Sequence, residues 1–184
     1  MNTMRTLLFT LFVICNLAFW GYGQGDNNDV KKGSMDSQLY DIAYLIQFRD
    51  SVNINVSKVP VAWHLDHTLK VVNRIHNILQ NSDPTVYEKR FSLTRVFSFT
   101  LGYIPRGRAK SPAAVLPPNT IKTEDILSQL EEARENLSEL EKLDQNVNFI
   151  HPVFGQLNKK QAKRFLKIHT KHHLKIVRDI LGKE

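Results

Sequence analysis

Apolar residues recur every three or four positions through most of the chain after residue 35, a spacing typical of amphipathic helices. The spacing predicts four main helices and one shorter apolar helix, over residues 36–49, 61–80, 91–101, 123–143 and 158–181. Because no alternating apolar pattern indicates a strand, we expect an all-α fold. The expected architecture is an up-down four-helix bundle with a short inserted helix and a long proline-rich loop.

Residues typical of helix ends mark several of these boundaries. Thr123 is the expected N-cap of the helix over 123–143. Asn158, followed by Gln161 three positions later, resembles a capping box ahead of the last helix. Gly102 is the expected end of the short apolar helix.

The first 23 residues have the pattern of an export signal. Arg5 gives a positive start, an apolar run from Leu7 to Trp20 follows, and the small residues Gly21 and Gly23 precede a polar tail. The run is shorter than the roughly 20 residues that span a membrane. We therefore expect a signal peptide at 1–23, a flexible tail at 24–35 and one helical domain at 36–184. The mature protein would be exported, periplasmic or extracellular, with no stable membrane span; an uncleaved signal that anchors it in the membrane is the alternative.

The composition limits the number of domains, the partners and the residue types that could form a functional site. The 184 residues suit one domain, and 25 Lys+Arg against 18 Asp+Glu give a formal net charge of +7. No DNA- or RNA-binding motif accompanies this charge, so we expect no nucleic-acid partner, while a small-molecule ligand and a homodimer stay open. The single Cys15 excludes disulfides, zinc fingers and iron–sulfur clusters in the domain. Cys15 would also be removed with the signal peptide. Of cysteine and histidine, only histidine then remains in the domain as a candidate metal ligand.

Three histidines are candidates for one metal site. His169 and His173 are four residues apart on the apolar face of the last helix, so two imidazoles can converge on one ion. On the helix over 61–80, the helical phase favours His64 as the third ligand, with His67 on the flank as the alternative. His172 also falls on a flank, so we expect it beside the site rather than in it.

One buried histidine alone would indicate a side chain that is hydrogen-bonded within the core. Three neutral imidazoles on facing helices change this interpretation, because unsatisfied buried nitrogens cost about 1–3 kcal/mol each and one divalent ion satisfies all three. We therefore predict a divalent metal ion at His64, His169 and His173. Zinc, nickel, iron and manganese remain open as its identity.

Three segments carry a family resemblance: WHLDHTLKVV at 63–72, HPVFG at 151–155 and HTKHHLKI at 169–176. Their order resembles the DinB-like superfamily, in particular an uncharacterised bacterial branch with HPxFG and HxxHH motifs. The resemblance covers residues 36–181 and implies a four-helix bundle with a metal triad that maps onto His64, His169 and His173. Characterised relatives include transferases and isomerases that use small thiols, so the resemblance does not fix the reaction.

Two further segments are candidates for roles near the site. His151 lies in the HPVFG segment, which we interpret as a structural plug leading by a tight turn into the last helix; a role beside the metal or toward substrate is the alternative. The connection from Tyr103 to Thr120 contains Arg106, Arg108 and Lys110. It is either a lid over the site or a solvent-exposed, proline-rich loop. Trp63 is expected to pack against the segment that precedes its helix.

The leading functional hypothesis is an exported metal-dependent enzyme of hydrolase or transferase type. Three protein ligands leave one metal position open, whereas structural zinc sites are usually closed by four. No nearby Asp or Glu can be named as a general base, so the catalytic residues stay unknown. The alternative is a non-enzymatic helical module that binds a metal or another ligand.

Overall fold

The computed structural model describes residues 35–107 and 111–183. The expectations for the signal peptide, Cys15 and the tail lie outside the described residues, as do Arg108 and Lys110. The described part is mostly helical, with one small two-stranded sheet. None of its helices is long and apolar enough to cross a membrane.

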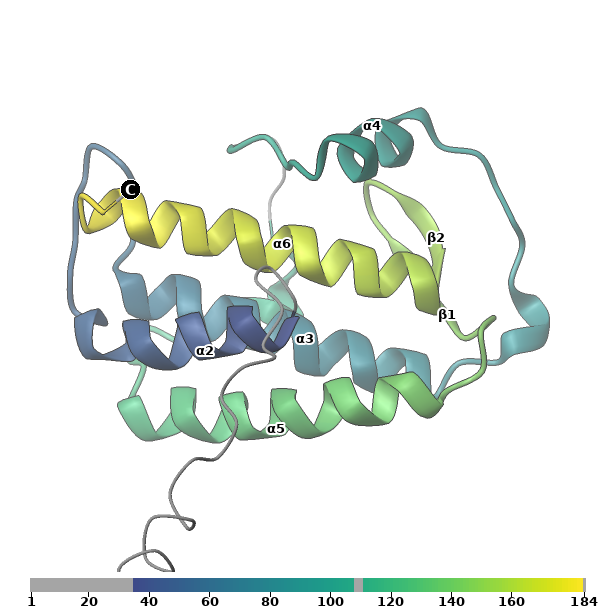
Figure 1. Cartoon of the computed structure of the whole chain (residues 1–184), viewed down its shortest axis with the longest axis horizontal. Coiled ribbons are helices and arrows are strands. Elements are labelled where there is room, and N and C mark those ends of the chain that lie inside the picture. Colours follow the sequence, from purple (N-terminus) through teal and green to yellow (C-terminus); the bar gives the residue numbers. More distant parts are fainter. Residues whose placement is uncertain (1–34, 108–110, 184) are drawn as a thin grey trace, which may run out of the picture. The chain divides into compact units, whose positions relative to one another are not determined.

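Four long helices lie side by side, and a fifth, shorter helix lies outside them (Figure 1). The five are α2 (Met35–Leu45), α3 (Val61–Gln80), α4 (Leu93–Leu101), α5 (Thr123–Lys142) and α6 (Lys159–Ile180). Short 3₁₀ turns occur at Ile46–Phe48, Pro84–Val86 and Ala113–Val115. The helical period thus predicts each helix within a few residues, and the first differs most because its last turn tightens into 3₁₀ geometry.

The predicted capping residues are partly confirmed. The Asn158 carboxamide accepts a hydrogen bond from the Gln161 N–H at 3.0 Å, and the Gln161 side chain accepts from the Asn158 N–H at 3.1 Å. Gly102 ends α4 in the left-handed conformation, with φ of 60°. The Thr123 N-cap is wrong: α5 is preceded by Lys122, and the Thr123 hydroxyl accepts instead from the Arg49 guanidinium at 2.7 Å.

A β-hairpin precedes α6, which corrects the all-helical expectation. Strands β1 (Asn148–His151) and β2 (Gly155–Asn158) pair antiparallel, with His151 opposite Gly155. The HPVFG segment is therefore the tip of a hairpin and not a turn leading directly into the helix. Two four-residue strands are too short to produce a recognisable alternation in the sequence, although Gly155, with φ of 72°, supplies the turn conformation that the motif suggested.

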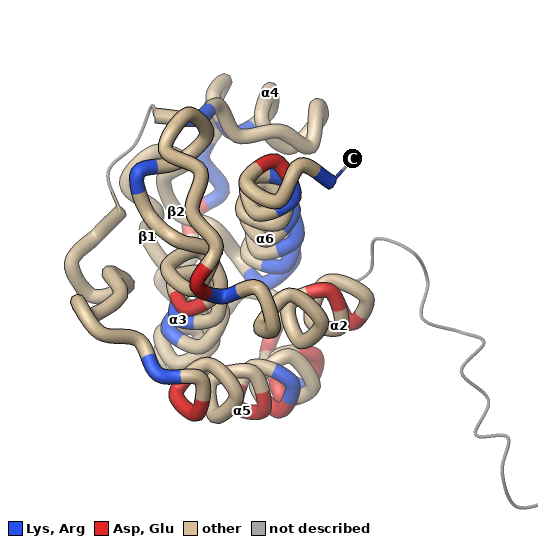
Figure 2. Tube along the Cα trace, turned by 90° about the vertical axis from the view of Figure 1, so that its left-hand side faces the viewer, with Lys and Arg blue, Asp and Glu red and all other residues tan. Residues whose placement is uncertain are grey.

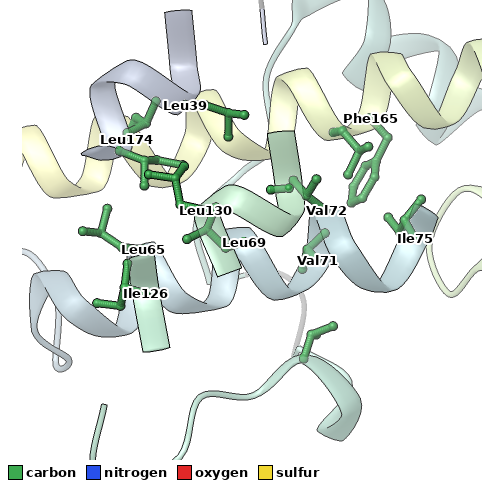
Figure 3. Packing of buried hydrophobic residues seen from close by; sticks show 14 of the residues in the cluster. Leu39, Leu65, Leu69, Val71, Val72, Ile75, Ile126, Leu130, Phe165 and Leu174 are labelled. Atoms are coloured by element: carbon green, nitrogen blue, oxygen red, sulfur yellow. The ribbon is translucent and has the colours of Figure 1, made fainter. Parts of the chain in front are cut away.

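The core lies between α2, α3, α5 and α6. Figure 3 shows Leu39 of α2, Leu65 and Leu69 of α3, Leu130 of α5 and Leu174 of α6 packed together. Helix α3 is buried on nearly every side, including polar positions. On the face toward α5, Asp66 accepts from Gln129 at 2.7 Å and pairs with Lys70 at 2.7 Å, and Asn73 donates to the Gln129 carbonyl at 3.1 Å. Polar residues of α3 thus form a buried network with α5.

Charge is distributed unevenly over the helices. Asp and Glu gather on α5, whereas Lys and Arg follow the outer side of α6 (Figure 2). His169 and His173 of α6 lie on the side that faces α3. Most of these lysines and arginines therefore lie on a face that is at least partly exposed to solvent.

Candidate metal centre

Helices α3 and α6 bring four histidines together. Two come from adjacent turns of α3, His64 and His67, and two from adjacent turns of α6, His169 and His173. Since residues three or four apart on a helix share one face, each pair points across the contact between the two helices. Close packing of α3 against α6 then places imidazole against imidazole.

Three of the four form a group with metal-binding geometry. One ring nitrogen from each of His67, His169 and His173 lies within 4.8 Å of the other two. The ring centroids are 5.2 Å apart for His67 and His169, 4.8 Å for His67 and His173, and 4.5 Å for His169 and His173. Nitrogens that share a tetrahedral zinc at about 2.1 Å lie about 3.4 Å apart, so a closure of little more than about 1 Å would suffice.

His67 is held from two sides. Its Nδ1 is 2.8 Å from the Val115 carbonyl, and since a carbonyl only accepts, Nδ1 carries the proton and donates it. The Trp63 indole stacks on the His67 ring, with centroids 4.9 Å apart and planes at 24°. Trp63 therefore packs within the histidine region. The remaining nitrogen, Nε2, is left with a free lone pair, which a metal ligand requires.

His169 has an unsatisfied nitrogen. Its Nδ1 is buried and has no hydrogen-bond partner among the described residues, which is rare for a polar atom in a folded protein. Its ring lies between Phe165 at 5.3 Å and His173 at 4.5 Å. A cation between the histidines would compensate for this burial, so the residues present fit a divalent metal.

His64, which the helical phase favours as third ligand, lies beside the group and is not a member of it. Its Nδ1 is 3.1 Å from Nδ1 of His173, and its Nε2 is 2.9 Å from the Ser57 hydroxyl. Helical phase places His67 on the flank of the apolar face of this helix. In the structure the turn at Ala113–Val115 covers that flank, which turns His67 into a buried residue.

Burial keeps these imidazoles neutral. It lowers the pKa of His64 to about 4, with a smaller effect from neighbouring His67. It also lowers the pKa of His67, and it moves the pKa values of His169 and His173 well below the usual value, with further lowering by the neighbouring histidines. Neutral imidazole is the form that binds metal, so the site does not have to release protons near neutral pH.

The two residues expected beside the site are indeed near it. His172 packs edge-on against His173 with centroids 5.1 Å apart, and it is hydrogen-bonded to the backbone of Ile104. His151 accepts at Nδ1 from the backbone N–H groups of Val153 and Phe154, at 3.1 and 3.2 Å, which stabilises the hairpin tip.

A series of contacts between rings connects the hairpin to the histidines. The His151 ring lies 4.6 Å from Phe165, which lies 5.3 Å from His169. Burial lowers the pKa of His151 to about 4. The HPVFG segment therefore adjoins the histidine group through Phe165.

The connection after α4 contributes further contacts near the site. Arg106 pairs with Asp179 of α6 at 2.5 Å, and the Val115 carbonyl accepts from His67. Sequence analysis did not find Val115, because an apolar residue that acts through its carbonyl leaves no signature. Ser57 was also missed, since an isolated serine ahead of a helix is typical of any turn.

Comparison with known proteins places the chain in a family. The sequence profile of the family described as "Protein of unknown function (DUF1569)" matches residues 85–180, slightly more than half of the chain. The chain belongs to this family. The matched segment contains the hairpin and the histidines of α6, whereas α3, with His64 and His67, precedes it. No curated protein and no solved structure matches the chain.

Proposed function

We propose that this DUF1569 protein binds one divalent metal ion through His67, His169 and His173. The observation that carries the proposal is the convergence of three neutral, buried or partly buried imidazoles from two helices, with one nitrogen of each within 4.8 Å of the other two. The arrangement of one helix supplying HxxxH and a second supplying one histidine supports membership in the DinB-like superfamily, with α2, α3, α5 and α6 as the up-down four-helix bundle.

The number of ligands favours a catalytic over a structural site. Among the described residues the group contains three histidines and no Cys, Asp or Glu as a fourth member. Asp66, the acid next to His67, is engaged by Gln129 and Lys70. A divalent ion held this way would keep one position open and supply Lewis-acid activation of a substrate or of water. We infer a metal-dependent hydrolase or transferase.

The surroundings of the group would serve such a site in two ways. Trp63 and Phe165 pack against the ligand rings and cover part of their surface, and reduced contact with water strengthens electrostatic interactions. The Val115 carbonyl fixes the orientation of His67. If the expected export signal is present, the reaction would take place outside the cytoplasm. Cleavage of this signal would also remove Cys15, the one cysteine of the sequence.

Cobalt substitution tests both the ligand set and the open position. The metal-free protein is titrated with Co²⁺ and its visible absorption is recorded, before and after addition of azide as an external ligand. We expect a four-coordinate spectrum that changes with azide, and loss of this spectrum in His67→Ala. His172→Ala is the matched control, because His172 adjoins the group without belonging to it.

The outcomes separate the enzyme from a binding module. A cobalt spectrum that does not respond to azide indicates a closed site and therefore the non-enzymatic alternative. Equal spectra in the wild type and His67→Ala would show that the ion binds elsewhere. Either result overturns the proposal.

A further inference from the structure

A chain of hydrogen bonds runs from the loop before α3 into the metal centre. The Ser57 hydroxyl lies 3.1 Å from the Val59 carbonyl and 2.9 Å from Nε2 of His64. Nδ1 of His64 in turn lies 3.1 Å from Nδ1 of His173. This series of hydrogen bonds thus ends at His173, one of the three histidines that we assign to the metal.

Only one placement of protons makes all three hydrogen bonds. The Val59 carbonyl can only accept, so the Ser57 hydroxyl proton is used there. His64 must then donate from Nε2 to the Ser57 oxygen, which leaves Nδ1 of His64 as an acceptor. His173 must therefore donate from its own Nδ1, so its Nε2 carries a lone pair and no proton.

We propose that Ser57 and His64 are positioning residues that hold the proton of His173 on Nδ1 and so prepare Nε2 to bind the ion. The inference rests on the proposed function, since it concerns a ligand of the same metal. It explains why a fourth histidine lies beside a group of three. It also gives His173 a side-chain partner that acts as the Val115 carbonyl does for His67.

Backbone hydrogen bonds of the loop before α3 hold Ser57 in place. The Ser57 N–H donates to the Asn53 carbonyl at 2.9 Å, and the Val59 N–H donates to the Ser57 oxygen at 3.2 Å. The Val61 N–H donates to the Ser51 carbonyl at 3.1 Å, which ties the loop to the first residue of α3. A serine held in this way can orient a histidine, whereas a freely rotating hydroxyl could not.

Nitrogen NMR of the metal-free full chain, labelled with ¹⁵N at histidine, tests the proton placement directly. We expect His173 to carry its proton on Nδ1, and His64 to carry its proton on Nε2. In Ser57→Ala the acceptor for His64 is lost, so the Nε2-protonated form of His173 should increase. Ser57→Thr, which retains the hydroxyl, should restore the wild-type pattern, and Ser128→Ala on the exposed side of α5 is the matched control.

Zinc affinity, measured by competition with a chelator of known affinity, gives the second readout. We expect Ser57→Ala to bind Zn²⁺ about 10-fold more weakly, the lower end of the range for residues that orient a ligand. Protonation of His173 on Nε2 in the wild type, or unchanged tautomer populations in Ser57→Ala, would overturn the proposed positioning. If the tautomers behave as expected but the wild type binds no divalent ion, the metal site fails and the proton placement stands.

Discussion

His67 is the residue on which the metal assignment most depends, because it is the only member of the group from α3. Replacing His67 with Ala would leave two ligands on one helix and free the Val115 carbonyl and the Trp63 ring. We expect Zn²⁺ affinity to fall by more than about 100-fold, beyond the range typical of residues that only orient a ligand.

His64→Ala is the comparison that distinguishes the two histidines of α3. Because His64 acts on the ion only through His173, its loss should weaken Zn²⁺ binding by about 10-fold to 100-fold. Isothermal titration calorimetry on both variants measures the difference. A larger loss in His64→Ala than in His67→Ala would return the third ligand to His64.

The lowered pKa values of the buried histidines also predict how stability depends on pH. In the metal-free fold, the pKa values of His64 and His151 are about 4, whereas the unfolded chain titrates near 6.5. Between these values the unfolded chain binds more protons, so the free energy of unfolding decreases as pH falls from about 6.5 toward 4.

The expected slope is roughly 1.4 kcal/mol per pH unit for each histidine that the unfolded chain protonates and the fold keeps neutral. Urea unfolding at several pH values in the presence of a chelator measures this slope. His64→Gln, which cannot titrate, should show a shallower dependence. A stability that is constant between pH 6.5 and 4.5 would contradict the neutral, buried state of these imidazoles.

For the individual histidines, the sequence predicts well which of them come together. It predicts less well which of them bind the metal. The HxxxH spacing places His169 and His173 on the inner face of α6, and the structure brings them together. The choice between His64 and His67 depends on what covers each flank of α3. That cover comes from a turn nearly fifty residues later in the chain, and helical phase contains no information about it.

Helix α4 is attached to the rest of the domain in an unusual way. Its apolar residues Leu93, Phe97 and Leu101 are exposed, whereas Arg95 is buried. The Arg95 guanidinium donates to the carbonyls of Phe154 and Gln156 at 3.1 and 3.2 Å, and also to the Arg90 carbonyl. A charged side chain thus holds the helix against the hairpin.

Arg95→Ala should therefore destabilise the protein by about 2–3 kcal/mol, since it leaves several buried carbonyls without donors. Leu101→Ser is the matched control and should change the free energy of unfolding by less than about 0.5 kcal/mol, because Leu101 is 70% exposed. Urea denaturation of both variants measures the two effects. Equal destabilisation would show that α4 is held by its apolar residues instead.

The helices and their ends are predicted more completely than the hairpin. Caps such as Asn158 and Gly102 act on neighbouring residues, so their effect is present in the local sequence. The hairpin depends on pairing between two strands of four residues each and on Arg95 from another element. Such contacts are set by tertiary packing, which a local pattern does not contain.

For the whole molecule, the proposed ion joins α3 to α6 and should stabilise the fold by mass action. A ligand present at about 100 times its dissociation constant stabilises by about 2.7 kcal/mol, which corresponds to about 5–10 °C in melting temperature for a domain of this size. We expect a chelator to remove this increment from the zinc-loaded wild type. Differential scanning calorimetry on the wild type and His173→Ala measures it, and the variant should melt at nearly the same temperature with and without chelator.

The most direct measurement is the metal content of the purified protein, determined by inductively coupled plasma mass spectrometry after loading with divalent ions and removal of the excess. We expect about one divalent ion per chain in the wild type and in His172→Ala, and less than about one tenth of that in His67→Ala and His169→Ala. Equal metal content in the wild type and His67→Ala, or none in the wild type, would contradict the three-histidine site.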